Sequence, residues 1–211
     1  MKPVITLLLV LLFVGCAQVP SRVDTPRNEG PDKSYTVELP IGWIKQATPD
    51  NATLLASRNG FLLEVIAITK RPVKEAFPKI KKAATPEMLP AELAELEIAQ
   101  MKSQDQFTAA LTVMENEPAE IAGHTGFRVG VRYKNNRGLE IQRVVYGFAD
   151  KSAYYDIGYG APILYYFDTY YPDFQKVVAS FQLSDSNKKT TSLKSQGFLS
   201  ENVTRTNWTG H

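Results

Sequence analysis

The sequence has very few residues of the kinds that bind metals or form disulfides. Its 211 residues include one cysteine, Cys16, and two histidines, His124 and His211. A single cysteine excludes a disulfide framework within the chain, and zinc sites draw most of their ligands from Cys and His. His211 ends the chain, and His124 lies between Gly123 and Gly126 in a predicted turn, where a histidine is usually solvated. We therefore expect no metal site and no cofactor.

An excess of charge of either sign is also missing. The chain has 24 Lys and Arg against 22 Asp and Glu, a formal net charge of +2. Surfaces that bind nucleic acids carry clustered Lys and Arg, which dominate the charge balance of such domains. We therefore expect no nucleic-acid partner.

Sequence motifs typical of enzymes do not occur. The chain contains no G-x-S-x-G, no H-E-x-x-H and no G-x-x-x-x-G-K-[ST], which are common signatures of hydrolases, metalloproteases and nucleotide-binding proteins. Carboxylates such as Glu92, Glu95 and Glu97 lie on a predicted helix and are expected to be solvated. Catalytic groups can converge from distant positions, so a hydrolase with a site assembled that way stays the alternative to a non-catalytic role.

The longest apolar run is too short to cross a membrane. Between Val4 and Val14 only Thr6 is not apolar, whereas a transmembrane helix needs about 20 apolar residues. This length is typical of the apolar region of a signal peptide. The run ends in Phe13-Val14-Gly15-Cys16, which resembles the lipobox of bacterial lipoproteins.

The lipobox resemblance implies a lipid anchor. Residues 1–15 would be cleaved away as a signal peptide, and the Cys16 thiol would carry a diacylglycerol, usually with a further acyl chain such as palmitate on the new amino terminus. Two or more acyl chains hold a protein stably, at about 0.8 kcal/mol per buried methylene. Ala17 stands where a retention signal would be Asp, which favours the outer membrane, facing the periplasm, in a double-membraned bacterium.

Two alternatives to the anchor stay open. An ordinary secretory signal with a chance cysteine would leave Cys16 as an unpaired thiol in an oxidising compartment, which would need its own explanation. A eukaryotic secreted protein would use the N-x-T sequon at Asn51 as a glycan acceptor.

The chain divides into an anchor, a tether, one domain and a tail. Residues 16–33 contain three prolines and mixed charges without apolar periodicity, so we expect a lipidated cysteine on a flexible tether. Residues 184–211 are rich in Ser, Thr, Asn and Lys and are expected to be a polar, disordered tail. Residues 34–183 have the patterning of a folded domain.

The pattern of the domain predicts an antiparallel sheet with helices. Asn59-Gly60 separates two β-rich runs within residues 52–70, a strong hairpin signal, and residues 135–138 join two further strands. Period-two alternation and apolar stripes at helical spacing predict strands near 34–39, 109–117, 125–134, 139–149 and 153–160, and helices near 73–83, 88–104 and 171–182. In the second of these helices Leu93, Leu96, Ile98 and Met101 are expected to form the buried stripe. Helices segregated from a run of strands indicate an α+β sandwich.

Several stretches resemble PsbP-like domains. A strand runs into a Pro-x-Gly-Trp turn in "YTVELPIGW", here Pro40, Gly42 and Trp43, and "EIAGHTGFRVGVRY", "QRVVYGFADKSAYYDIGYGAP" and "FQKVVASFQ" follow in the layout of that group. The resemblance implies an α/β/α sandwich over about 150 residues. The group includes an extrinsic photosystem II subunit, a GTPase-binding nuclear transport factor and many bacterial lipoproteins, so it implies no particular activity.

A tyrosine-rich stretch, residues 154–171, is the strongest candidate for a binding surface. Tyrosine has a large apolar area with a polar tip and is enriched where proteins meet partners. The alternative is that strand alternation places half of these side chains in the core. The candidate partner-binding residues are Tyr154, Tyr155, Tyr159, Tyr165 and Tyr166, with Arg128, Arg132 and Arg143 on neighbouring strands. We expect a membrane-anchored envelope lipoprotein with a non-catalytic binding or assembly role, its partner being an envelope protein or a small ligand.

Overall fold

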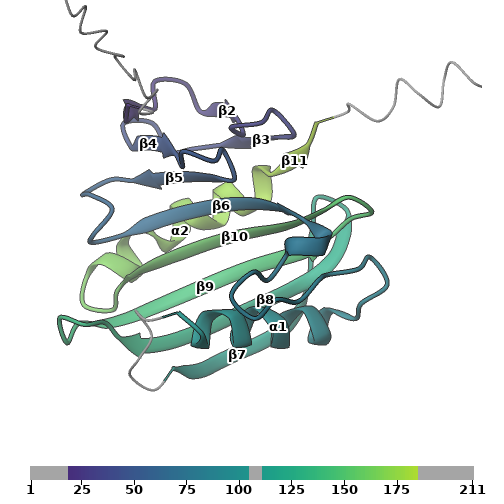
Figure 1. Ribbon diagram of the computed structural model, residues 1–211. Coiled ribbons are helices and arrows are strands. Elements are labelled where there is room, and N and C mark those ends of the chain that lie inside the picture. Colours follow the sequence, from purple (N-terminus) through teal and green to yellow (C-terminus); the bar gives the residue numbers. More distant parts are fainter. Residues whose placement is uncertain (1–18, 105–110, 185–211) are drawn as a thin grey trace, which may run out of the picture.

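A large antiparallel sheet forms the centre of the molecule (Figure 1). The computed structural model describes residues 19–104 and 111–184. Eight strands of this part pair in the order β1 (Ser21–Arg22), β4 (Ile44–Ala47), β5 (Thr53–Ser57), β6 (Val65–Pro72), β10 (Ala153–Pro162), β9 (Glu140–Ala149), β8 (His124–Lys134) and β7 (Thr112–Ile121). A second sheet has the order β11 (Gln182–Leu183), β3 (Tyr35–Glu38) and β2 (Arg27–Glu29).

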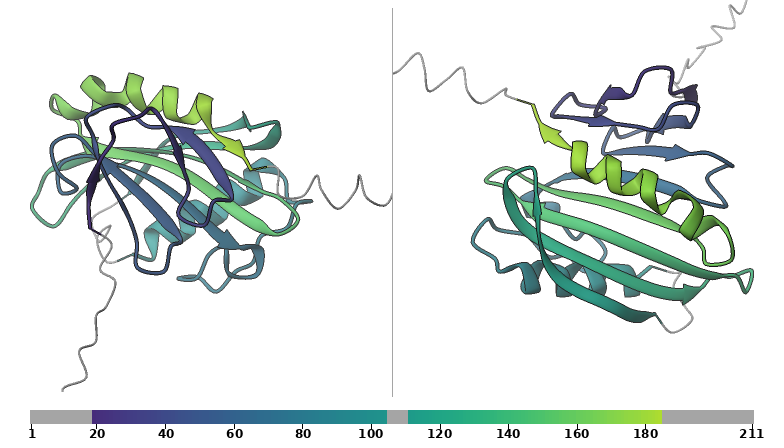
Figure 2. Two further views of the ribbon diagram at one scale, coloured as in Figure 1. Left: turned by 90° about the horizontal axis from the view of Figure 1, so that it is seen from above. Right: turned by 180° about the vertical axis from the view of Figure 1, so that it is seen from behind.

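Two helices cover opposite faces of the large sheet. Helix α1 (Pro90–Lys102) lies across β7, β8 and β9 in front of the sheet in Figure 1, and helix α2 (Tyr166–Ser180) lies behind β6 and β10. The two further views in Figure 2 show the same arrangement, with the small sheet beside α2. The prediction of an α+β sandwich with helices on an antiparallel sheet is therefore confirmed.

The α2 face is packed with aromatic rings. Its buried cluster includes Tyr35 and Trp43 from the amino-terminal half, Tyr155 and Tyr159 from β10, and Phe174 from α2. The rings of Tyr159 and Phe174 stack with centroids 5.5 Å apart. This cluster joins the small sheet, α2 and the large sheet into one core.

The α1 face has a second core. Phe127, Val129 and Val131 alternate along β8 toward α1, where Leu93 and Met101 pack on them. The intervening Arg128, Arg132 and Lys134 point to the other face, so the predicted alternation in β8 is confirmed. Gly147 of β9 leaves the space that the Phe127 ring fills, because a Cβ there would lie 2.6 Å from that ring.

Both predicted hairpins are present. Strands β5 and β6 pair in antiparallel register around Asn59-Gly60, and Gly60 adopts φ +107°, which suits glycine. Strands β8 and β9 are joined by residues 135–138, where the Gly138 N–H donates to the Asn135 carbonyl over 2.9 Å.

The prediction of a flexible tether is wrong for residues 19–33. Strand β1 pairs with β4, β2 pairs with β3, and Val23 between them is fully buried. The Val23 N–H donates to the Trp43 carbonyl over 2.8 Å, and the Gly42 N–H donates to the Val23 carbonyl over 2.8 Å. Distant backbone therefore orders a segment whose own pattern contains no apolar period.

The helix predicted at Val73–Ala83 is reduced to one 3-10 turn, Val73–Glu75. Phe77 and Lys82 instead exchange backbone hydrogen bonds of 3.1 and 3.2 Å across an isolated bridge. Pro78 has no N–H to donate, and Lys81 adopts φ +54°, so the backbone turns back on itself rather than continuing as a helix.

Helix α2 begins at Tyr166, five residues before the predicted start, and contains Pro172 in its interior. A proline has no N–H to donate and is best tolerated in the first turn of a helix. For that reason the sequence predicts the helix start beside Pro172 and not at Tyr166. The predicted signal peptide at residues 1–15, Cys16 and residues 185–211 of the predicted tail lie outside the described residues.

Candidate functional site

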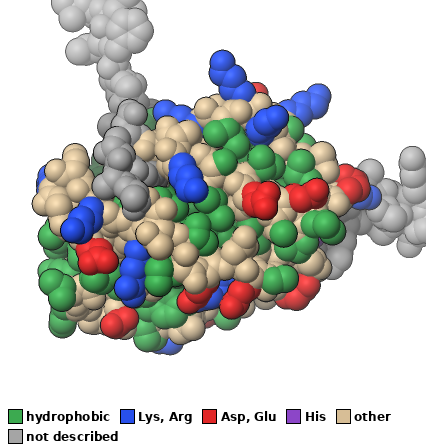
Figure 3. Space-filling view, turned by 90° about the horizontal axis from the view of Figure 1, so that it is seen from below, with side chains coloured by type: hydrophobic (Ala, Val, Ile, Leu, Met, Phe, Trp, Pro, Cys, Tyr) green, Lys and Arg blue, Asp and Glu red, His purple; other side chains and the backbone are tan. Residues whose placement is uncertain are grey.

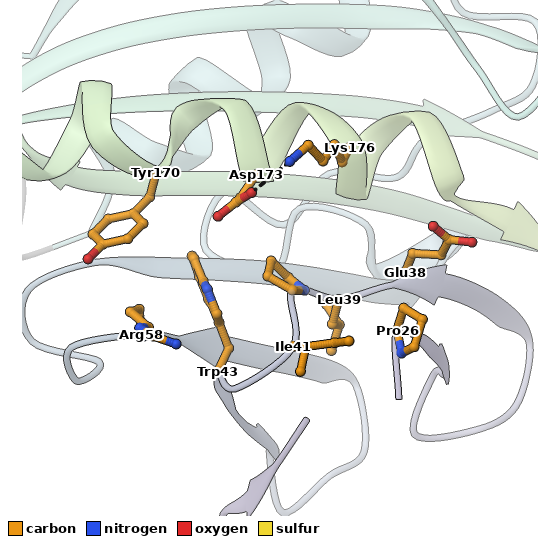
Figure 4. Close-up of a pocket in the computed structure, with 10 residues that line it drawn as sticks. Pro26, Glu38, Leu39, Ile41, Trp43, Arg58, Tyr170, Asp173 and Lys176 are labelled. Carbon is orange, nitrogen blue, oxygen red and sulfur yellow. Dashed lines mark hydrogen bonds and ion pairs between the residues drawn. The ribbon is translucent and has the colours of Figure 1, made fainter. Parts of the chain in front are cut away.

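A cleft of about 570 Å³ runs between α2 and the turn that joins β3 to β4 (Figure 4). Small-molecule and peptide sites are usually clefts of about 300–1,000 Å³ with an apolar lining and a few polar groups. The apolar lining comes from Pro26, Leu39, Pro40, Ile41, Trp43 and Tyr170, and the charged side chains at its edge are Glu38, Arg58, Asp173 and Lys176.

One wall of the cleft is the Pro-x-Gly-Trp turn that resembles the PsbP-like motif. The Trp43 N–H donates to the Pro40 carbonyl over 3.3 Å, and Gly42 adopts φ +83°. These are the features of a type II turn, which needs glycine at its third position. The turn leaves Ile41 61% exposed at its tip, while Trp43 folds beneath it and is almost fully buried.

The opposite wall is one face of α2. Tyr170, Asp173 and Lys176 recur every three residues along α2. In Figure 4 Tyr170 and Asp173 extend toward the turn, and Lys176 extends along the helix toward Asp173. The Lys176 Nζ lies 3.1 Å from the Asp173 carboxylate. The Trp43 ring meets the Tyr170 ring edge to face, with centroids 5.7 Å apart, and closes the floor between the two walls.

The arrangement in the cleft suits binding of an apolar group flanked by charges. The floor contains aromatic and aliphatic side chains, which contribute through the area they bury. Arg58 lies at one end and Glu38 near the other, so both ends can pair with an opposite charge on a partner (Figure 4).

Three of the five predicted tyrosines lie in the core. Tyr154 and Tyr159 are 0% exposed, and Tyr155 is 3% exposed. Tyr165 is 70% exposed and Tyr166 is half-buried, both at the junction of β10 and α2. Strand alternation in β10 therefore accounts for the buried three, and partner binding stays a prediction whose surface candidates are Tyr165 and Tyr166.

The three predicted arginines do not form one group. Arg128 and Arg132 lie on the α2 face, where Arg128 donates to the Tyr171 hydroxyl over 3.2 Å and pairs with Glu115. Arg132 donates to the Gln142 side chain over 3.0 Å. Arg143 lies on the α1 face, against Gly158 of β10.

A group of buried ionisable side chains lies beneath α1, and the prediction that Glu97 is solvated is wrong. Glu97 is 4% exposed, and the Tyr154 hydroxyl donates to it over 3.1 Å. Arg71 Nη1 lies 3.1 Å from the carboxylate of Asp156, which is 2% exposed. Burial, followed by the charge of Asp156, raises the pKa of Glu97 to about 7, against the attraction of Arg71 and Arg143.

Helical spacing could have identified Glu97 as buried. Leu93, Glu97 and Met101 recur every four residues, and the structure buries all three, whereas Leu96 and Ile98 of the predicted stripe are only half-buried. The cleft could not be identified from the sequence in this way. Its residues come from four separate segments, and only the Pro-x-Gly-Trp turn has a recognisable pattern.

Histidine and acidic residues do not converge on a metal site within residues 19–104 and 111–184. His124 is the first residue of β8, and its ring stacks on Phe148 at 4.7 Å. In the same part of the chain, neither helix has the length and apolar character needed to cross a bilayer.

Comparisons with known proteins identify the fold. No family model matches the chain, and no curated protein matches it in sequence. The solution structure of cyanobacterial PsbP (CyanoP) from Synechocystis sp. PCC 6803 is similar, with a TM-score of 0.55 and 13% identity over 75% of this chain and 91% of that chain. A mutant of the protein Mog1 has a TM-score of 0.53 and 12% identity over 76% of this chain and 96% of that chain. The fold is therefore PsbP-like.

Proposed function

We propose that this protein is a non-catalytic lipoprotein of the bacterial cell envelope that binds a segment of a partner protein in the cleft between α2 and the β3–β4 turn. The observation that carries the proposal is the cleft itself, with Trp43 and Tyr170 at its floor and charges of both signs at its edge. The partner segment carries an apolar side chain that enters the cleft and charged groups that meet Arg58 and Glu38.

The envelope location rests on the sequence. Phe13-Val14-Gly15-Cys16 fits a lipobox, and Ala17 after it favours the outer membrane, facing the periplasm. Lipidation of Cys16 would hold the domain permanently at that membrane. The small size of the cleft fits a peptide segment better than a broad interface, which buries about 800 Å² on each partner.

The test is crosslinking from inside the cleft in living cells. A photoreactive amino acid replaces Ile41, the exposed residue at the rim, and in a matched strain it replaces Leu89, which is 64% exposed and precedes α1. We expect an adduct of one defined mass from position 41 and none from position 89. The adduct should disappear when Tyr170→Ala removes one side of the floor.

Equal labelling from positions 41 and 89, or an adduct indifferent to Tyr170→Ala, would contradict the cleft as the binding site. Repeating the experiment with Cys16→Ser separates the anchor from the cleft. If Cys16→Ser abolishes the adduct while the cleft is unchanged, the anchor is what brings the cleft to its partner.

A further inference from the structure

Three loops at one end of the large sheet expose large apolar side chains. They are residues 58–64 between β5 and β6, 135–139 between β8 and β9, and 163–165 between β10 and α2. The strand register brings them together, because Gly160 of β10 pairs with both Val65 and Arg143, and Pro162 pairs with Ile141. We name the exposed apolar residues of these loops the loop patch: Leu62, Leu139, Leu164 and Tyr165, which are 77%, 42%, 82% and 70% exposed.

The loop patch surrounds a hollow rather than a flat surface. A depression of about 370 Å³ lies among the three loops, lined by Leu63, Leu139, Glu140, Pro162, Ile163, Leu164 and Tyr166. Solvent-exposed aliphatic residues are ordinary when scattered singly, but a group of them at one end marks an interaction surface.

The backbone of the third loop is strained in a way that exposes the patch. Tyr165 adopts φ +72° and ψ −55°, and the Tyr166 N–H donates to the Leu164 carbonyl over 2.9 Å. This is a γ-turn with a positive φ, which is rare and strained for a residue other than glycine. The turn holds Leu164 and Tyr165 away from the core, and strain of this kind is found mostly at functional positions.

The first loop is braced from inside. One oxygen of the buried Glu64 accepts hydrogen bonds from the backbone N–H groups of Arg58 and Asn59, at 2.7 and 2.6 Å. Leu62 therefore projects from an ordered loop, so its exposure is a fixed feature of the fold.

Of the exposed charged side chains of these loops, Arg137 lies beside the hollow. Arg58 lies toward the turn at Gly42 and lines the cleft, and the carboxylate of Glu140, the first residue of β9, lines the hollow. In Figure 3 basic and acidic side chains both lie among the apolar ones at the left-hand end of the molecule. An apolar patch with Arg137 beside it matches the boundary of an anionic bilayer, where the acyl region takes the apolar groups and headgroup phosphates pair with Arg.

A short chain segment separates the folded domain from Cys16, so a lipid on Cys16 would place the domain next to the bilayer. Val19, where the described chain begins, follows Cys16 by three residues, which span at most about 11 Å. Because residues 19–33 belong to the folded domain, a lipid on Cys16 would hold that domain against the membrane rather than at the end of a long tether.

From these observations we infer that the loop patch docks on the lipid bilayer, as a second contact that orients the anchored domain. This inference rests on the proposed function, because the anchor keeps the patch at the membrane. Leu62, Leu164 and Tyr165 enter the boundary between headgroups and acyl chains, and Arg137 remains at the level of the phosphates.

The test places a fluorescent probe on the patch. The only thiol of the chain, Cys16, would carry the lipid, so an introduced cysteine is the one site for labelling. Leu164→Cys carries an environment-sensitive probe, and Leu89→Cys, at an exposed position immediately before α1, is the matched control. Envelope-purified protein is mixed into vesicles of phosphatidylethanolamine and phosphatidylglycerol in equal parts, with and without a quencher on the acyl chains. We expect at least about a twofold loss of emission at position 164, none at position 89, and recovery when Leu62→Ser weakens insertion.

Emission at position 164 that is as insensitive to the quencher as at position 89 would overturn the inference. A change at position 164 that depends on protein concentration without vesicles would also overturn it, since the occupant would then be a second copy of the chain. The mass of Cys16 and the adduct at Ile41 are measured separately, so failure of the loop patch is distinguishable from failure of the anchor or the cleft.

Discussion

The two faces of the large sheet are built from different chemistry. On the α2 face, Phe174 and Tyr159 belong to a cluster of aromatic rings. On the α1 face, the apolar side chains surround Glu97 and Asp156, two carboxylates that are 4% and 2% exposed. The core on the α2 face is thus built mainly from aromatic rings, and the core on the α1 face encloses buried carboxylates.

This difference predicts that the packing of the two helices responds differently to pH. Burial of aromatic area does not depend on pH, so α2 and the cleft beside it should keep their geometry over a wide range. A buried carboxylate with a raised pKa links proton uptake to folding, so the packing of α1 should loosen as pH rises. Single substitutions on each face should therefore differ in how their effect on stability depends on pH.

The largest effect is expected from Phe174→Ala. Phe174 is fully buried and packs between α2 and β10, and deleting a buried aromatic ring costs about 3–5 kcal/mol of unfolding free energy. Urea unfolding of the purified chain at about pH 5 and about pH 8 measures this loss of unfolding free energy. The loss should be the same at both values, and a loss that changes with pH would show that the two faces are not independent.

Glu97→Gln should remove most of the pH dependence. The folded pKa of Glu97, about 7, lies above its ordinary value of 4.5, so its contribution to stability is complete below that ordinary value and is lost as pH rises through about 7. The variant should therefore be more stable than the natural protein at about pH 8, by about 2 kcal/mol, with little difference at about pH 5.

The matched control for Glu97→Gln is Glu95→Gln on the exposed side of the same helix. Its unfolding free energy should follow the natural protein at every pH. Asp156, Arg71, Tyr154 and Arg143 face Glu97 from β10, β6 and β9 and are unchanged in both variants. If Glu97→Gln leaves the pH dependence intact, the titrating group is not Glu97.

Tyr154→Phe should lower the unfolding free energy by a smaller amount, mainly at high pH. Its hydroxyl donates to Glu97 over 3.1 Å, which favours the ionised carboxylate and lowers the pKa of Glu97. Without it the protein should lose about 1–2 kcal/mol at about pH 8 and less at about pH 5. The midpoint of the pH dependence should move upward, as followed by circular dichroism, and a downward move would contradict the hydrogen bond.

The smallest loss of stability is expected from Arg128→Gln on the α2 face. Arg128 pairs with Glu115, donates to Tyr171 and lies 5.9 Å from the centre of the Tyr146 ring. Because the pair is partly exposed, we expect a loss of about 1 kcal/mol or less, decreasing further as salt is added. Thermal unfolding at low and high salt measures this loss of stability. A loss that is insensitive to salt would indicate that the aliphatic part of the Arg128 side chain stabilises the protein by packing instead.

Local patterns were sufficient for most of the sheet. The alternation along β8, the Asn59-Gly60 hairpin and the Pro40–Trp43 turn each depend on residues close in sequence, and all three are present. Order in residues 19–33 could not be predicted, because it comes from pairing with β3 and β4 rather than from an apolar period of its own.

The candidate sites depended more strongly on distant contacts. Whether Tyr159 or Tyr165 reaches the surface is decided by the end of β10 and the γ-turn before α2, which no local pattern indicates. The cleft joins Ile41, Arg58 and Asp173 from three segments. Their proximity follows only from the packing of α2 on the sheet.

An envelope lipoprotein with a binding cleft is best tested by the intact mass of the protein purified from its native envelope, measured beside the Cys16→Ser variant. We expect a chain that begins at Cys16 and carries a diacylglycerol and a further acyl chain, all lost in the variant. Cleavage at another position with an unmodified thiol would contradict it, because the cleft and the loop patch would then belong to a protein without an anchor.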